Sequence, residues 1–196
     1  MRWIILAALF LPAATPLAAQ GELGVKLGLT FGDISNKGLL PGNLDTRNGV
    51  AGGLSLGLRS GVVGMGVDAL YAQRGLRSSQ SLANSQTRLD YLDLPVYLKV
   101  TIPTPGIRPF GYAGPQVSWE LKCRRANGTE CGATVPERPS VVYAGVVGAG
   151  VRFGGRMGLS VEGRYVYGLT DLKLTTLTSN ESFKHRTFML LLAVGL

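Results

Sequence analysis

Residues 184–196, at the C-terminus, alternate between large apolar side chains and mostly smaller ones. Successive side chains of a β-strand point to opposite sides, so one face of this segment is uniformly bulky and apolar. That face carries Phe188, Leu190, Leu192, Val194 and Leu196. Residues 22–31 repeat the pattern, with a face that carries Leu23, Val25, Leu27, Leu29 and Phe31. We predict that these two segments pair and close a membrane-spanning β-barrel, with the bulky face toward lipid.

The same alternation recurs along the chain and predicts eight strands. Their expected ranges are 22–31, 48–59, 62–73, 87–101, 108–121, 140–153, 157–168 and 184–196. The connections between them alternate between long and short, and the long ones are 32–47, 74–86, 122–139 and 169–183. Outer-membrane barrels have short periplasmic turns, longer extracellular loops and an even strand count. The expected fold is therefore all-β, an eight-stranded antiparallel up-and-down transmembrane β-barrel, with both termini in the periplasm.

Two strands contain prolines that interrupt their pattern. Pro95 lacks a backbone N–H, so we expect a bulge or local break there. A second bulge is expected around Gly114 and Pro115, where the two faces of the strand are hard to separate.

Residues 1–20 have the features of a secretory signal peptide. Arg2 supplies the charged start, an apolar run follows, and the segment ends in small residues with a cleavage region between Ala18 and Gly21. A retained N-terminal anchor is the alternative, but the apolar run is short for a spanning helix, which needs ~20 apolar residues. We expect a cleaved signal peptide and one barrel domain, residues 21–196.

Eight charged residues within the predicted strands fall on the face opposite the bulky one. A Lys or Arg facing lipid near the bilayer midplane costs ~2–4 kcal/mol, so this face must point into the lumen. An eight-stranded barrel is about wide enough for side chains to fill, and charges buried there must be paired or hydrated. We predict a plugged lumen with a charge network of Lys26, Arg59, Asp68, Asp93, Lys99, Arg152, Glu162 and Arg164.

Aromatic side chains near strand ends are typical of belts at the two membrane interfaces. We expect such a belt to contain Phe31, Tyr71, Phe110, Trp119, Phe153 and Tyr167. Ordinary strand propensity of aromatic residues is the alternative explanation for each of them.

The chain has two cysteines, Cys123 and Cys131, within a polar stretch. In an exported protein such a close pair is expected to form a disulfide that pins a loop. Two thiols without further ligands make a poor zinc site, and the glycines follow strand alternation rather than a phosphate-binding loop. We expect neither a metal nor a cofactor.

Several stretches resemble the PorT-like outer-membrane β-barrel domain family, whose members are also called porin-family proteins. Residues 24–29, GVKLGL, resemble its opening G-V-K-x-G motif, and residues 70–75, LYAQRG, resemble its L-Y-x-x-K-G motif. Residues 91–99, YLDLPVYLK, are similar to its Y-L-x-[IL]-P-x-x-[LY]-K strand, and residues 109–115 are similar to its aromatic-Gly-Pro segment. The resemblance implies an eight-stranded barrel in the outer membrane of a Gram-negative bacterium, and it implies little about activity.

Function is less constrained than fold. The leading interpretation is a non-enzymatic outer-membrane barrel with a structural or surface-interaction role. The alternatives are a narrow porin-like channel and a soluble lipocalin-like binder, whose interior should be apolar. A lipid-modifying enzyme is a further alternative, because the single histidine, His185, lies near Asp171, Glu181 and Ser182 in the sequence. No motif in the sequence supports a catalytic triad among them. Their nearness in the sequence is no evidence for one, because a triad is defined by the geometry of its side chains.

The formal charge of +8 raises the question of partners. Nucleic acid is not expected, because the basic residues are scattered and the chain is exported. Loop cations could instead meet lipopolysaccharide phosphates, with a solvated surface as the alternative; they are Arg47, Arg74, Arg77, Lys122, Arg124, Arg125 and Lys184. The other expected partners are outer-membrane lipid and, during insertion, the barrel-assembly machinery. We expect the barrel to be a monomer.

Overall fold

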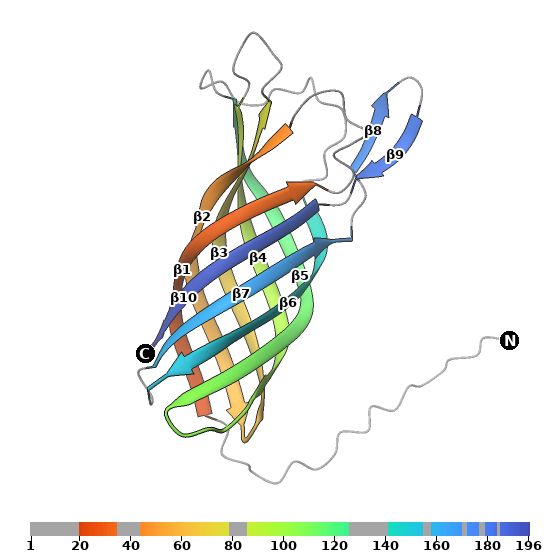
Figure 1. Cartoon of the computed structure of the whole chain (residues 1–196). Coiled ribbons are helices and arrows are strands. Elements are labelled where there is room, and N and C mark those ends of the chain that lie inside the picture. The colour runs from red at the N-terminus through yellow and green to blue at the C-terminus, as the bar shows by residue number, and fades with distance from the viewer. Residues whose placement is uncertain are drawn as a thin grey trace, which may run out of the picture.

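The computed structural model describes residues 20–34, 44–78, 86–125, 141–154, 158–169, 172–176, 179–183 and 185–196. In this part of the chain, eight strands close into an antiparallel barrel in the order β1-β10-β7-β6-β5-β4-β3-β2 (Figure 1). They are β1 (Gln20–Ile34), β2 (Leu44–Ser60), β3 (Val63–Ser78), β4 (Gln86–Thr101), β5 (Ile107–Arg125), β6 (Val141–Phe153), β7 (Leu159–Gly168) and β10 (His185–Gly195). This confirms the predicted fold class.

The first and last barrel strands close the cylinder, as the sequence predicts. β1 pairs with β10 from Gly24 opposite Gly195 to Ile34 opposite His185. Leu27 and Leu192 face each other across this seam with more than half of their surface exposed. The alternation of the two segments therefore places their bulky side chains on the outside of the barrel.

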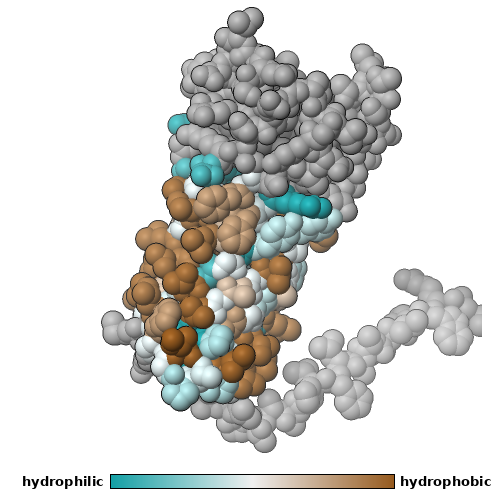
Figure 2. Space-filling model, in the orientation of Figure 1, coloured by the Kyte–Doolittle hydropathy of each residue, from teal (hydrophilic) through white to brown (hydrophobic). Residues whose placement is uncertain are grey.

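Apolar side chains gather on the described part of the barrel wall that Figure 2 shows. Every strand contributes exposed aliphatic or aromatic residues, for example Leu56 on β2, Leu98 on β4 and Val147 on β6. The residues between them point inward and are mostly buried or half-buried. Among the residues that the structure describes, no helix is long and apolar enough to cross a membrane.

Short turns join the strands at one end of the barrel, which we call the turn end. Gly61, Gly106 and Gly154 occupy these turns with positive φ, a conformation that costs glycine little. Because the strands are antiparallel, β1 starts and β10 ends here too; the opposite end is called the loop end. This arrangement agrees with the predicted alternation of long and short connections, although the long connections lie largely outside the described residues.

The strands extend further toward the loop end than the apolar pattern predicts. β3 continues to Ser78 and β5 to Arg125, within segments expected to be loops. A second sheet, β8 (Leu172–Thr176) with β9 (Ser179–Phe183), lies beside the loop end where a loop was predicted (Figure 1). Backbone pairing in these parts continues without a long alternation of apolar residues, which is why the sequence pattern missed it.

The bulge predicted at Gly114–Pro115 is wrong. At Pro95, where a bulge or local break was expected, there is no bulge, but the β4–β5 pairing is interrupted at Val96 and Tyr97. The β4–β5 pairing passes from Pro95 opposite Gln116 to Leu98 opposite Ala113 without a change of register. Gly114 makes this possible, because a Cβ at that position would overlap the carbonyl oxygen of Val96. The register shift between these strands lies instead between Asp90 and Tyr91.

Candidate functional site: the charged lumen

The structure places the eight predicted lumen charges on inward-facing strand positions. Five are buried: Lys26, Asp68, Asp93, Glu162 and Arg164. The other three are partly exposed toward the turn end: Arg59, Lys99 and Arg152. The set does not form one network. It divides into three layers along the barrel axis.

The middle layer is an ion network that joins opposite sides of the barrel. Lys26 Nζ on β1 lies 3.1 Å from Asp68 Oδ2 on β3 and 3.0 Å from Glu162 Oε1 on β7. Arg164 Nη2 lies 3.0 Å from Glu162 Oε1 and also pairs with Asp68. The four formal charges cancel, so attraction within the set can offset the cost of taking these groups out of water.

Two tyrosines complete the middle layer. Tyr97 donates a hydrogen bond of 2.9 Å to Asp68 Oδ1, and Tyr112 donates one of 3.1 Å to Glu162 Oε1. Arg164 Nε in turn donates to the Tyr112 hydroxyl at 2.8 Å. The two rings lie 4.6 Å apart, and Lys26 and Arg164 lie within about 6 Å of both centroids. We call these six residues the central plug, because they cross the lumen at mid-height.

The second layer, toward the loop end, is an ion pair that the sequence analysis missed in part. Asp93 was predicted, but its partner Arg74 was expected to be a loop cation. Arg74 lies on β3, is buried, and its Nη2 is 2.5 Å from Asp93 Oδ2. Its guanidinium also lies 4.9 Å from the centroid of Tyr91. The signal was in the sequence, since Arg74 continues the inward alternation of Asp68, but the polar residues around it indicated a loop.

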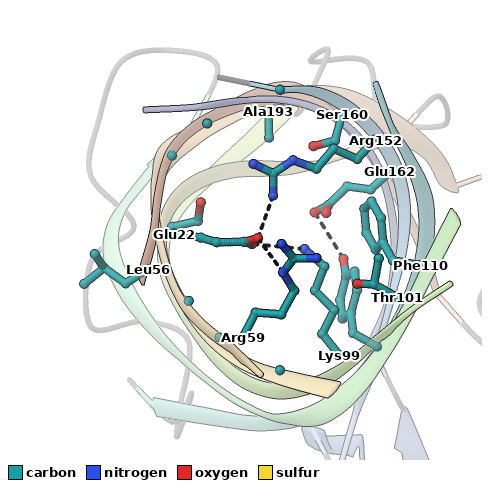
Figure 3. Close-up of a pocket in the computed structure, with 18 of the residues that line it drawn as sticks. Glu22, Leu56, Arg59, Lys99, Thr101, Phe110, Arg152, Ser160, Glu162 and Ala193 are labelled. Carbon is teal, nitrogen blue, oxygen red and sulfur yellow. Dashed lines mark hydrogen bonds and ion pairs between the residues drawn. The ribbon is translucent and has the colours of Figure 1, made fainter. Parts of the chain in front are cut away.

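The third layer lies at the turn end, around Glu22. Oε1 of Glu22 lies 3.3 Å from Arg59 Nε and 2.8 Å from Arg152 Nη1, while Oε2 lies 3.6 Å from Lys99 Nζ. Figure 3 shows the three cations converging on this carboxylate from different strands. The sequence analysis did not select Glu22, although it shares the inward face with Lys26. We call Glu22, Arg59, Lys99 and Arg152 the basic mouth.

The basic mouth borders a cavity of about 60 Å³. Thr101, Phe110 and Ser160 also line it (Figure 3). Phe110 was expected in the aromatic belt, but it is buried in the lumen, and Lys99 Nζ lies 4.5 Å from its centroid. Phe110 lies two positions before Tyr112 on β5, so both side chains are on the inward face. The prediction considered only that Phe110 is near the end of its strand, and this does not show which face it is on.

Other predicted site residues lie at the edge of what the structure describes. Cys123 is on β5, but Cys131 lies outside the described residues, so the disulfide stays a prediction. Asp171 and the side chains of His185, Glu181 and Ser182 also lie outside them. Among the described residues, no group of three or more His, Cys, Asp and Glu side chains could hold a metal ion.

Comparison with known proteins agrees with this geometry. A family model described as "Outer membrane protein beta-barrel domain" matches residues 18–174. The chain belongs to this family. The comparison with curated proteins gives no match.

Solved structures of other proteins are similar to this barrel. Neisserial surface protein A (NspA) is 14% identical, with 89% of this chain and 96% of that chain covered and a TM-score of 0.57. OprG from Pseudomonas aeruginosa is 10% identical, with coverages of 91% and 97% and a TM-score of 0.50. The outer membrane enzyme PagL is 15% identical, with coverages of 86% and 98% and a TM-score of 0.48. At such identities the NspA and OprG matches speak for the fold alone.

Proposed function

We propose that this outer-membrane barrel is a non-enzymatic protein with a structural or surface-interaction role and a closed lumen. The central plug is the observation that carries the proposal. Its four charged side chains come from β1, β3 and β7, and its tyrosines come from β4 and β5. An ion crossing the barrel would have to separate buried pairs whose members are 0–6% exposed. Leaving a buried charge unpaired costs several kcal/mol, so the lumen is expected to stay shut.

The test is a measurement of ion conductance across a bilayer. Folded protein, verified by its shifted migration on an unboiled gel, is reconstituted into planar bilayers beside an open porin as a positive control. We expect the protein to insert without stable conductance steps, because the plug blocks the lumen. Regular single-channel steps from the wild-type protein would contradict the closed lumen and favour the narrow channel.

The soluble lipocalin-like alternative has less support. A lipocalin-like binder needs an apolar interior, whereas the middle of this lumen is occupied by ion pairs. The outer wall is apolar on every strand, which suits contact with lipid acyl chains. We therefore place the barrel in the outer membrane of a Gram-negative bacterium, with the turn end in the periplasm, as a monomer inserted by the barrel-assembly machinery. The PorT-like resemblance stays our finer family assignment.

The export signal and the loop contacts belong to the same proposal. β1 begins at Gln20, the last residue of the segment expected to be a cleaved signal peptide. Lys122 and Arg124 are exposed on β5 near the loop end, where lipopolysaccharide phosphates of the outer leaflet would lie. Replacing both by Gln and measuring association with lipopolysaccharide tests this contact, and unchanged association would contradict it. Arg74 no longer belongs to this set, because it is buried against Asp93.

A further inference from the structure

The ionic groups of the lumen are unevenly distributed along the barrel axis. In the central plug Lys26 and Arg164 balance Asp68 and Glu162, and toward the loop end Arg74 balances Asp93. The basic mouth is different, because three cations surround the single carboxylate of Glu22. Among the four side chains of the basic mouth, positive charges therefore exceed negative charges by two.

This excess charge lies where a ligand could reach it. The side chains of Arg59, Lys99 and Arg152 are 24%, 22% and 15% exposed, far more than those of the central plug. They border the cavity of about 60 Å³, which is large enough for several water molecules at 10–15 Å³ each. Arg108 lies beside them and lines a small adjoining hollow together with all three cations.

The cavity ends in a floor, so a ligand entering from the turn end would stop beside the cations. Tyr97, Tyr112 and Glu162 of the central plug line its inner side. Phe110 forms an apolar wall beneath Lys99. Hydroxyl groups of Thr101 and Ser160 also face this space and could donate further hydrogen bonds (Figure 3).

We propose that the basic mouth binds a phosphate-like oxyanion presented from the turn end of the barrel. A phosphate or phosphomonoester carries a charge of about −1.5 to −2 at neutral pH, which matches the excess of two positive charges. Arginine presents N–H donors in a fork that fits phosphate oxygens, and two of the three cations are arginines. The assignment of this end to the periplasm rests on the proposed function. The binding itself is argued from the cavity and its cations alone.

The first experiment measures binding of inorganic phosphate to the folded barrel by calorimetry, in a detergent without phosphate groups. We expect saturable one-site binding that weakens as salt is added, since partly exposed charges are screened. Lys99→Gln and Arg152→Gln should each weaken binding about tenfold, because each removes a charge-assisted hydrogen bond. Lys99→Arg should keep it. Lys173→Gln removes an equal charge on β8, beside the loop end, and should leave binding unchanged.

Glu22→Gln separates this proposal from a purely structural cluster. Phosphate must compete with the Glu22 carboxylate for the three cations, so removing the negative charge of Glu22 should tighten phosphate binding severalfold. A cluster that only holds the strands together would instead show a less stable barrel and no binding at all. Each variant is first checked for folding on an unboiled gel.

A second arm distinguishes the two sources of phosphate. Glycerol phosphate serves as the soluble phosphomonoester, and short-chain phosphatidic acid in mixed micelles serves as the lipid headgroup. Binding of either probe, lost in Arg152→Gln and kept in Lys173→Gln, supports the proposal and identifies the source. Absence of saturable binding by inorganic phosphate and by both of these probes would overturn it, while the conductance test of the closed lumen would be unaffected.

Discussion

Arg164 is the most constrained charge of the lumen at the scale of single residues. Its side chain has no exposed surface, and it contacts Asp68, Glu162 and Tyr112 at once. Removing one member of such a set leaves the others buried without a counter-charge, which costs more than the set itself contributes. The identity of residue 164 therefore depends on side chains from two other strands, β3 and β5, as well as on Glu162 of its own strand.

Arg164→Met should lower the free energy of unfolding by about 3–5 kcal/mol, because Asp68 and Glu162 would then share only Lys26. Adding Asp68→Asn should recover part of this loss, since Lys26 and Glu162 remain a pair at 3.0 Å. Urea unfolding from lipid vesicles measures both. Arg124→Met, at an exposed position on β5, is the matched control and should change stability by less than about 1 kcal/mol. A double variant no more stable than the single one would contradict the pairing.

The sequence predicts which of these residues point inward, but not which of them meet. Alternation alone assigns Lys26, Asp68 and Glu162 to the inner face, because the first two lie between outward apolar neighbours and Glu162 directly follows Val161. Their contact spans 42 and 136 positions in the chain and depends on how the strands close and on their register. Glu22 was missed because it lies at the first position of the strand expected there, where no apolar neighbour precedes it.

At the scale of strands, the β4–β5 ladder shows how two prolines are accommodated without a bulge. Pro95 and Pro115 lie on these strands, and neither can donate a backbone hydrogen bond. The register nevertheless stays the same on both sides, because Gly114 lets the Val96 carbonyl approach closely. The prolines could be recognised in the sequence, but the compensation by Gly114 needs the position of the neighbouring strand.

Gly114→Ala should destabilise the barrel by about 1–3 kcal/mol, since its Cβ would collide with backbone atoms that cannot rotate away. Gly145→Ala, on the neighbouring β6, is the control because a Cβ there meets nothing within 4 Å. We expect its effect to stay within about 0.5 kcal/mol. The measurement is again urea unfolding in vesicles, and equal effects of the two substitutions would show that close approach at Gly114 is not what matters.

At the scale of the whole molecule, the barrel reverses the arrangement of a water-soluble protein. Its buried ion pairs lie inside, while most of its large aliphatic side chains lie outside, on all eight strands of the described barrel. Such a wall is stable only where the surroundings are apolar over the same height. The closed order of strands also leaves no free edge in the barrel, so every strand is paired on both sides.

This inverted arrangement predicts that the cost of an outward charge depends on its depth. Leu27 is 62% exposed in the middle of β1, whereas Asn48 is exposed on β2 opposite Phe31, nearer the loop end. Leu27→Arg should cost about 2–4 kcal/mol and Asn48→Arg about 0–1 kcal/mol, because only the first places its charge near the bilayer midplane. Both variants add one positive charge, so a general charge effect cancels in the comparison. The measurement is the free energy of unfolding of both variants from lipid vesicles. Equal costs for the two substitutions would mean that the outer wall does not face acyl chains.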